Sequence, residues 1–282
     1  MVFSSFLIRN RKGALASVIT QVTGFSGKKV KRLIDEGVVS INGVKVRKRN
    51  FPLSFKDSVE FSVSEFLFQK NFDIEVLYED EIFLVVNKPP FINTNNDKPD
   101  LEGILRRKYG NIYAVHRLDK QTSGAVIFVK DKKVFYAMVE IFKRKKITKT
   151  YKAVISGRFF LEKMLSFKLD GRDAVSFIKP VEIFENATLV DVRIETGRKH
   201  QIRRHLSMLG FPVAGEFLYW KKTFPFLLRF APRIMLHSEH ISFKSPVNGK
   251  RIDIKAPILE DFRSFLNVVR RGREVLPLKE YT

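Results

Sequence analysis

The sequence predicts an α+β fold built around a mixed, largely antiparallel sheet, with helices and loops around a cleft and a small separate domain at the N-terminus. Candidate strands outnumber candidate helices, and few of them form βαβ repeats, which favours the α+β class. Residues 189–195 alternate apolar and polar side chains as a half-buried strand does, whereas residues 125–129 are continuously apolar, as in a buried strand. We expect the small domain at residues 1–66 and the large domain at residues 67–282.

The charge of the chain points to a polyanionic partner. Its 282 residues include 52 basic and 30 acidic side chains, a net charge of +22. Nucleic acid is the leading candidate, because no long apolar segment or basic amphipathic anchor favours a membrane. The absence of cysteine excludes disulfides and thiolate chemistry, and the five histidines show no metal-ligand spacing, so no metal site is expected. Motifs for nucleotide hydrolysis and acyl transfer are also missing.

The N-terminal residues combine one helix with one hairpin. Ser26 can cap a helix that begins at Gly27, and Gly37 can end it, because glycine adopts the left-handed conformation at a helix C-terminus without strain. Asn42-Gly43 predicts the tight turn of a hairpin whose strands lie at residues 38–41 and 44–46. The buried face of the helix is expected to consist of Val30, Leu33 and Ile34.

Basic side chains gather on this helix and hairpin. Through residue 66 the chain has 12 Lys and Arg against 5 Asp and Glu. A charge run is usually only a solvated face, but clustering on two adjacent elements favours a phosphate-binding surface. The segment from Gly27 to Gly43 resembles the α-L RNA-binding module first described in a small-subunit ribosomal protein, which implies RNA binding without catalysis. The residues expected to contact RNA here are Lys28, Lys29, Lys31, Arg32 and Lys45.

The large domain is expected to follow an apolar linker at residues 64–72. It begins with two strands, at residues 74–78 and 82–86, and Asn87-Lys88-Pro89-Pro90 ends the second one because two prolines cannot continue a ladder. The later elements are a helix at 101–109, a helix capped by Asp131, strands at 149–155 and 189–195, an aromatic and basic excursion at 217–233, and a closing hairpin with strands at 241–243 and 252–254.

One charged loop lies directly before the buried strand at residues 125–129. It reads His116-Arg117-Leu118-Asp119-Lys120-Gln121-Thr122-Ser123-Gly124. A loop on the rim of a buried strand commonly presents a reactive group in a cleft, so Asp119 is a candidate catalytic carboxylate. The alternative is an ion pair between Asp119 and Arg117 that only fixes the loop. Chemistry by a single carboxylate, without metal or cofactor, would be nucleophilic or acid–base work at a sugar or a base.

A second charged stretch follows the strand at residues 189–195. Thr196 can cap a helix that runs from about Arg198 to Leu209. Basic side chains in the first turns of such a helix would form an anion site, and the alternative is an exposed basic helix. These side chains are Arg198, Lys199, His200 and Arg203.

Both stretches resemble the RluA-type pseudouridine synthases. The nine residues around Asp119 look like the signature of that family, and residues 196–206 with residues 209–215 look like its third motif. Lys88 and Tyr151 fall where the family has its lysine-proline turn and its active-site tyrosine. An N-terminal α-L module is common in this family, mainly in members that act on ribosomal RNA.

The resemblance implies isomerisation of uridine to pseudouridine in RNA, with large-subunit ribosomal RNA favoured over transfer RNA, and it implies neither metal nor cofactor. Asp119 would be the nucleophile, Arg203 would pair with it, and Tyr151 would stack on the uracil. It leaves open whether Asp119 attacks the base or the sugar, or supports elimination at the sugar. The target base would be flipped out, and Arg117 would fill the gap. Further RNA contacts are expected from Lys88, His116, Arg198 and His200.

Three positions depart from the family pattern: Phe91 and Trp220 stand where glycine is frequent, and Glu216 stands where aspartate is usual. None of them removes a proposed catalytic residue, so catalysis is the main hypothesis. The alternatives are a non-catalytic RNA-binding or ribosome-assembly factor on the same fold, and a DNA-binding protein favoured by net charge alone. We expect a monomer in the cytoplasm of a bacterium, with an organelle as the less favoured location.

Overall fold

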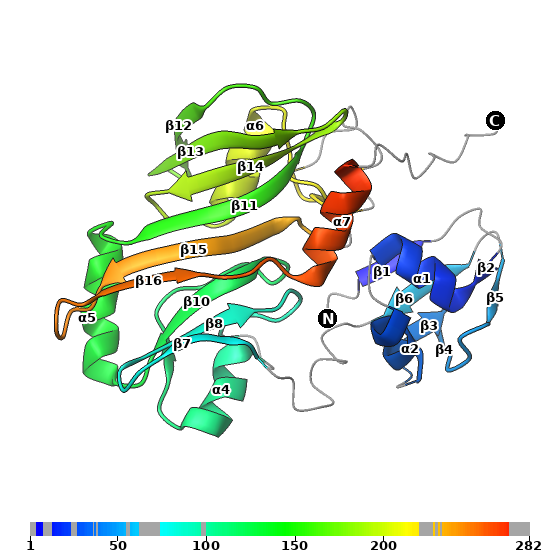
Figure 1. Cartoon of the computed structure of the whole chain (residues 1–282), viewed down its shortest axis with the longest axis horizontal. Helices are drawn as coiled ribbons and strands as arrows, with labels where there is room; N and C mark the ends of the chain where they lie inside the picture. Colours follow the sequence, from blue (N-terminus) through cyan, green and yellow to red (C-terminus); the bar gives the residue numbers. More distant parts are fainter. Residues whose placement is uncertain are drawn as a thin grey trace. The chain divides into compact units, whose positions relative to one another are not determined.

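The computed structural model divides the chain into two units (Figure 1). The first comprises Met1–Asp73, Glu260–Val268 and Arg273–Thr282, and the second comprises Ile74–Leu259 and Val269–Gly272. The expected domain boundary after residue 66 lies outside the described residues and stays a prediction. The structure describes residues 4–7, 13–23, 27–35, 37, 39–54, 57–61, 74–96, 100–219, 228, 231 and 233–270.

The N-terminal unit contains the expected helix and hairpin. Helix α2 (Gly27–Asp35) buries Val30, Leu33 and Ile34 completely, and Gly37 follows it with a left-handed φ of 69°. At the hairpin turn Asn42 and Gly43 have φ values of 52° and 79°, which is the conformation that an Asn-Gly pair favours. Ser26, the expected cap of the helix, lies outside the described residues.

Further elements of this unit were not expected from the sequence. Helix α1 (Leu15–Thr23) packs against α2, and four strands form a sheet in the order β1-β6-β3-β4, while β2 pairs with β5. The strands are β1 (Ser4–Leu7), β2 (Gly13–Ala14), β3 (Val39–Ile41), β4 (Val44–Lys45), β5 (Pro52–Leu53) and β6 (Ser58–Phe61).

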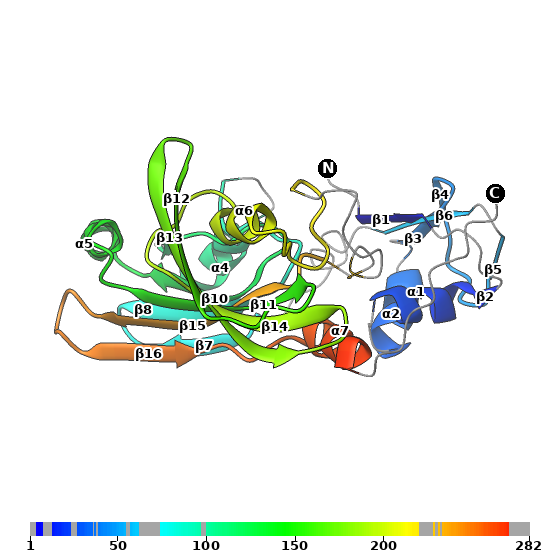
Figure 2. The same cartoon turned by 90° about the horizontal axis from the view of Figure 1, so that it is seen from above.

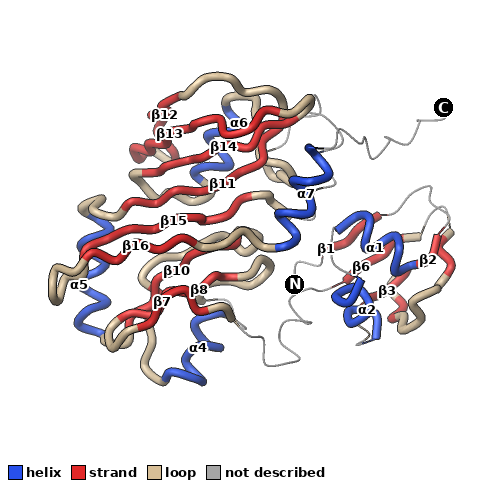
Figure 3. The backbone as a smooth tube through the Cα atoms, in the orientation of Figure 1, coloured by secondary structure: helices blue, strands red, loops and turns tan. Residues whose placement is uncertain are grey.

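A ten-stranded mixed sheet dominates the second unit, as Figure 3 shows by colour. Its main path runs β12-β13-β14-β11-β15-β10-β8-β7, with β16 on β15 and β9 on β10. Of the described strand pairs only β10 with β15 is parallel, so the predicted α+β class and largely antiparallel sheet are confirmed. The strands are β7 (Val76–Glu79), β8 (Phe83–Lys88), β9 (Tyr113–Ala114), β10 (Ser123–Val129), β11 (Thr148–Ser156), β12 (Lys163–Leu169), β13 (Arg172–Ile183), β14 (Ala187–Ile194), β15 (Leu236–Lys244) and β16 (Arg251–Lys255).

Strands β8 and β10 form the centre of the core. Every residue of both strands is buried, as the continuous apolar run at residues 125–129 predicts. One hydrophobic cluster joins Val85 of β8 and Ile127 of β10 to Met138 of the helix that follows β10. The loop that carries Asp119 therefore ends in the fully buried centre of the sheet.

Helices α4 (Leu101–Tyr109), α5 (Lys132–Lys143) and α6 (Gln201–Met208) lie on the same side of this sheet in Figure 2. The Asp131 carboxylate accepts hydrogen bonds from the backbone N–H groups of Lys133 (2.7 Å) and Val134 (3.0 Å), so the expected cap of α5 is confirmed. Helix α7 (Glu260–Arg270) follows the last strand. None of the described helices has the length and apolarity that crossing a membrane requires.

The expected cap of the helix after β14 is wrong. Helix α6 begins at Gln201 rather than near Arg198, and the Thr196 hydroxyl donates to the side-chain Oε1 of Gln201 (2.6 Å) instead of capping the backbone. The residue in the N-cap position is His200, which has a left-handed backbone and no capping hydrogen bond from its side chain. Lys199 and His200 consequently lie in a loop before the helix.

Gly124 allows β10 and β15 to approach each other closely. It has a φ of 115°, and a Cβ atom at this position would lie 2.3 Å from the carbonyl oxygen of Ser238. Ser238 is also the register partner of Tyr151 on β11. The sheet therefore aligns the end of the Asp119 loop with Tyr151 across three neighbouring strands.

Candidate active site

The Asp119 loop presents its carboxylate at the surface while its neighbours hold it in place. Leu118 is buried, and its backbone N–H donates to the Thr94 hydroxyl (3.1 Å). The Thr122 N–H donates to the Asp119 carbonyl (3.0 Å) and closes a turn. The Asp119 side chain remains 30% exposed, so a substrate can reach it.

Lys88 anchors the Asp119 loop from the interior of the protein. Its ammonium group is completely buried and donates to the carbonyls of Pro89 (2.9 Å), Ile92 (2.9 Å) and Lys120 (3.3 Å). Burial holds the pKa of Lys88 well below its ordinary value. The expectation that Lys88 contacts RNA is therefore wrong, because three backbone carbonyls inside the protein take up its donors.

The backbone conformation at Phe91 explains why glycine is frequent at this position in the family. Its φ of 69° lies in the left-handed region that favours glycine, the residue frequent there in the family. Its backbone N–H donates to the Lys120 carbonyl (2.6 Å), the same carbonyl that Lys88 approaches. The lysine-proline turn is thereby tied to the Asp119 loop by both a side chain and the backbone.

Arg233, which the sequence does not single out, holds the other end of the loop. Its guanidinium is buried and donates to the Gln121 carbonyl (3.2 Å) and the Ser123 hydroxyl (2.9 Å). Ser123 also shares a hydrogen bond with Nδ1 of His237 (2.8 Å). Arg233 stands in the basic excursion at residues 217–233, where no sequence signal separates it from solvated cations.

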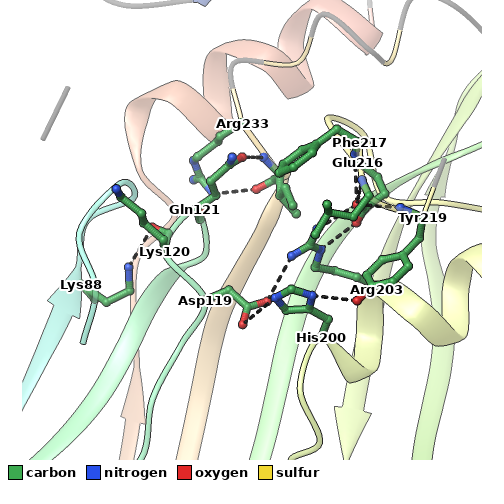
Figure 4. A network of polar contacts seen from close by, with 12 residues as sticks. Lys88, Asp119, Lys120, Gln121, His200, Arg203, Glu216, Phe217, Tyr219 and Arg233 are labelled. Carbon is green, nitrogen blue, oxygen red and sulfur yellow. Dashed lines mark hydrogen bonds and ion pairs between the residues drawn. The ribbon is translucent and has the colours of Figure 1, made fainter. Parts of the chain in front are cut away.

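Arg203 is fixed by Glu216 and faces Asp119 (Figure 4). Its Nε and Nη2 donate to the two carboxylate oxygens of Glu216 at 2.7 Å and 2.8 Å, and both side chains are buried. Its Nη1 lies 3.6 Å from Oδ2 of Asp119. Burial alone would raise the pKa of Glu216, but the fork to Arg203 and backbone N–H groups bring it below its ordinary value. Arg203 therefore meets Asp119, as expected, but binds Glu216 more tightly.

His200 lies on the other side of the Asp119 carboxylate. Its Nε2 is 3.7 Å from Oδ1 of Asp119, and its Nδ1 is 2.9 Å from the Tyr219 hydroxyl. Burial lowers the pKa of His200 below its ordinary value. The sequence predicts His200 as an RNA contact, whereas the structure brings its ring to the Asp119 carboxylate.

Tyr151 is buried on β11, within the electrostatic reach of Asp119. Burial raises the pKa of its phenol above the ordinary value, so the hydroxyl stays protonated at neutral pH. Its register partner Ser238 on β15 is also the partner of Gly124 on β10, so a single strand separates Tyr151 from the strand that follows Asp119. The three residues expected to be catalytic thus belong to one site.

The other expected RNA contacts differ in their exposure. Arg117 is exposed, and Arg198 is partly exposed with its Nε donating to the Asp173 carbonyl (3.0 Å). Nε2 of His116 accepts the Ile127 N–H (3.1 Å), and its ring stacks on Phe142. Burial, reinforced by Lys149, lowers the pKa of His116 to about 3. An RNA contact by His116 is therefore not supported, because its acceptor nitrogen and one ring face are occupied within the protein.

In the N-terminal unit the expected RNA contacts are exposed where the structure describes them. The exposed residues are Lys28, Lys31, Arg32 and Lys45, and the side chain of Lys29 lies outside the described part. Among the residues that the structure describes, no group of three or more His, Asp or Glu side chains is placed to hold a metal ion.

Comparison with known proteins identifies relatives along most of the chain. Residues 82–208 match the family model described as RNA pseudouridylate synthase. A Helicobacter pylori (strain ATCC 700392 / 26695) protein named uncharacterized RNA pseudouridine synthase is 35% identical over 242 residues, which cover 80% of this chain and 91% of that protein. The ribosomal large subunit pseudouridine synthase D of Zymomonas mobilis is 30% identical over 289 residues, covering 89% and 90%.

A solved structure shares the fold. The protein titled human RNA pseudouridylate synthase domain containing 1 matches with a TM-score of 0.58 and 23% identity, covering 67% of this chain and 86% of that one. The Asp119 and Arg203 motifs, the sheet that brings them together and the close Helicobacter pylori relative agree with one another. The chain therefore belongs to the RluA-type RNA pseudouridine synthases, enzymes that isomerise uridine to pseudouridine in RNA.

Proposed function

We propose that this chain converts specific uridines of large-subunit ribosomal RNA to pseudouridine, with Asp119 as the nucleophile. The observation that carries the proposal is the Asp119 carboxylate, 30% exposed on the rim of a buried strand, with the fixed guanidinium of Arg203 at 3.6 Å. A carboxylate that is accessible on one side and oriented by a fixed cation on the other is suited to covalent catalysis.

The isomerisation needs no external reactant. The C1′–N1 bond of the uridine breaks, the uracil turns, and C5 bonds to C1′. The C5 hydrogen leaves as a proton, and N1 gains one. Asp119 would bond transiently to the base or the sugar, or support elimination at the sugar, and it would be released when the new C–C bond is complete.

Tyr151 would stack on the uracil during this rotation. Tyr151 is buried on β11, and its phenol is neutral at the pH of the reaction because burial raises its pKa. Stacking of a base on an aromatic ring is worth about 1–3 kcal/mol. Such a platform would hold the detached uracil close to the sugar without bonding to it.

The target uridine must leave its stack before Asp119 can reach it, at a cost of a few kcal/mol. Arg117 is exposed and stands two positions before Asp119 in the same loop. Its long planar side chain could occupy the space that the flipped base leaves and offset part of that cost.

The N-terminal unit would hold the RNA backbone through its exposed cations, Lys28, Lys31, Arg32 and Lys45. Two observations support ribosomal RNA as the substrate: the resemblance of this unit to a ribosomal RNA-binding module, and the names of relatives such as the Zymomonas mobilis ribosomal large subunit enzyme. Such an enzyme would work where ribosomes are assembled, in the cytoplasm of a bacterium.

The test is to incubate the protein with deproteinised ribosomal and transfer RNA from a host that lacks it, and to map pseudouridine chemically. We expect at least one new site in large-subunit ribosomal RNA with the wild type and none with Asp119→Asn. New sites in transfer RNA alone would change the proposed substrate. No new site, or the same sites with Asp119→Asn, would contradict the proposal.

A further inference from the structure

His200 has a backbone conformation that residues other than glycine seldom adopt. Its φ of 53° and ψ of 29° are left-handed, which costs an L-residue other than glycine roughly 1–2 kcal/mol. The side chain makes no capping hydrogen bond to α6, so the helix gains nothing from it. Strain of this kind persists where the surroundings hold a side chain in a required place, and here the imidazole lies between Asp119 and Tyr219 (Figure 4).

The two neighbours of the ring determine which nitrogen carries the hydrogen. A neutral imidazole has one N–H donor and one acceptor nitrogen, and a carboxylate can only accept. Nε2, 3.7 Å from Oδ1 of Asp119, must therefore carry the hydrogen for the contact to be favourable. Nδ1 is then the acceptor for the Tyr219 hydroxyl at 2.9 Å. The opposite tautomer would set a lone pair against a negatively charged oxygen.

The Asp119 carboxylate is thus approached on both oxygens. Oδ1 faces Nε2 of His200, and Oδ2 faces Nη1 of Arg203 at 3.6 Å. These distances are longer than hydrogen bonds, and such contacts in an enzyme without substrate commonly tighten when the substrate binds. Together the two contacts would fix the plane of the carboxylate.

Glu216 holds both Arg203 and the segment that carries Tyr219. Its carboxylate binds Arg203, and Oε1 also accepts the backbone N–H groups of Phe217 (3.0 Å), Leu218 (2.8 Å) and Tyr219 (3.3 Å). The guanidinium of Arg203 lies 5.4 Å from the centre of the Tyr219 ring. One buried carboxylate therefore sets the position of the group that faces Oδ2 and of the tyrosine that contacts His200.

We propose that His200 is a positioning residue for Asp119, and that Tyr219 acts through it by holding the tautomer that presents Nε2–H to the carboxylate. The inference rests on the proposed nucleophilic role of Asp119 and adds a second side chain, beside Arg203, that sets its orientation.

The arrangement requires His200 to be neutral. Asp119 and Glu216 favour its protonation, Arg203 and Lys199 oppose it, and burial lowers its pKa below the ordinary value. Tyr219 is the remaining group against the ring and can accept a hydrogen bond as well as donate one. An imidazolium would pair with Asp119 and make the carboxylate less nucleophilic, so the rate should fall on the acid side, at a pH below the ordinary pKa of histidine.

Three substitutions separate positioning from backbone strain. His200→Gln can place an amide N–H near the position of Nε2. His200→Asn tolerates the left-handed backbone best but is too short to reach Asp119, and His200→Ala removes the group. We expect single-turnover rates about 10- to 100-fold lower for Asn and Ala. The single-turnover rate of the Gln variant should stay within about fivefold of the wild-type rate, and it should not show the fall at acid pH that protonation of His200 causes. All three variants should bind the RNA with an affinity within about twofold of the wild type.

The order of effects decides the question. A backbone role predicts that Asn is the mildest change in both thermal stability and rate, whereas positioning predicts Asn to be the most stable variant and Gln the most active. Tyr219→Phe should slow the wild type several-fold and have no further effect in the His200→Gln background. Rates that follow stability, or a loss of rate in His200→Gln at the same acid pH as in the wild type, would overturn the inference. A fully active His200→Ala beside an inactive Asp119→Asn overturns this inference alone, and an active Asp119→Asn overturns the proposed function as well.

Discussion

Buried cations in this site keep their place in two different ways. Lys88 is surrounded by neutral carbonyls, and Arg203 by the charged Glu216. The sequence motifs were sufficient to bring Asp119, Tyr151 and Arg203 together as a candidate site. They could not identify Glu216 as the partner of Arg203, because that pairing depends on how the segment after α6 folds back onto it. Glu216 registered only as a departure from the family pattern.

Removing the charge of Glu216 should therefore be costly. Glu216→Gln leaves the buried Arg203 guanidinium without a counter-charge, which typically costs about 3–5 kcal/mol of unfolding free energy. Glu216→Asp keeps the charge on a shorter side chain and serves as the control. Urea unfolding followed by circular dichroism would measure both, and equal stabilities for the Gln variant and the wild type would disprove the role given to this pair.

Lys149 offers a pH test of burial. It is 8% exposed, and burial lowers its pKa to about 8 from the ordinary 10.5. Between these two values the unfolded chain binds a proton that the folded chain does not, so the unfolding free energy should rise with pH in this window. Lys149→Met should flatten that rise and stabilise the protein at pH 7 by on the order of 3 kcal/mol. The exposed Lys168→Met is the control, and an unchanged pH dependence in Lys149→Met would contradict the assignment.

Single elements were predicted where local signals were strong. Helix α4 matches its expected range of 101–109, and α5 has its aspartate cap. The hairpin of β12 and β13 was missed, although Asp170-Gly171 is a strong turn signal and Leu165 and Leu169 alternate with polar residues before it. The start of α6 was predicted three residues too early, because the Thr196 hydroxyl prefers the Gln201 side chain and only the folded loop brings the two together.

The contact between β10 and β15 should be the most sensitive strand pairing in the large unit. In Gly124→Ala a Cβ would meet the Ser238 carbonyl, and the two strands would have to separate. Gly171→Ala is the control for a positive φ, because its φ of 72° also strains an L-residue, by about 1–2 kcal/mol, while its Cβ would face open space. We expect Gly124→Ala to lose several-fold more stability than the control in thermal unfolding. Similar losses would show that the close approach is not decisive.

At the scale of the whole molecule, the net charge of +22 could arise from scattered cations or from a dedicated surface. The structure divides the chain into two units, one with exposed basic residues on α2 and its hairpin and the other with the candidate active site. Composition alone could predict an anionic partner, but it could not assign the binding to one unit. The salt dependence of RNA binding, measured for variants of each unit, can show which unit binds the RNA.

Replacing Lys28, Lys31 and Lys45 with glutamine should reduce the salt dependence of RNA binding. Each lost phosphate contact lowers the slope of log K against log salt by about 0.7–0.9, so three contacts correspond to a change of about 2–3. The control replaces the exposed Lys244, Lys250 and Lys255 of the β15–β16 hairpin, which removes the same charge from the other unit. Equal slopes for the two triple variants would mean that total charge, not the N-terminal unit, governs binding.

The central claim is that Asp119 performs the isomerisation. Its most direct test is the single-turnover release of tritium from RNA labelled at C5 of uridine, because the C5 hydrogen must leave when C5 bonds to the sugar. The wild type should release the label with formation of pseudouridine, and Asp119→Asn should be slower by more than about 1,000-fold while binding the RNA equally well. Release by Asp119→Asn at the wild-type rate would contradict the account.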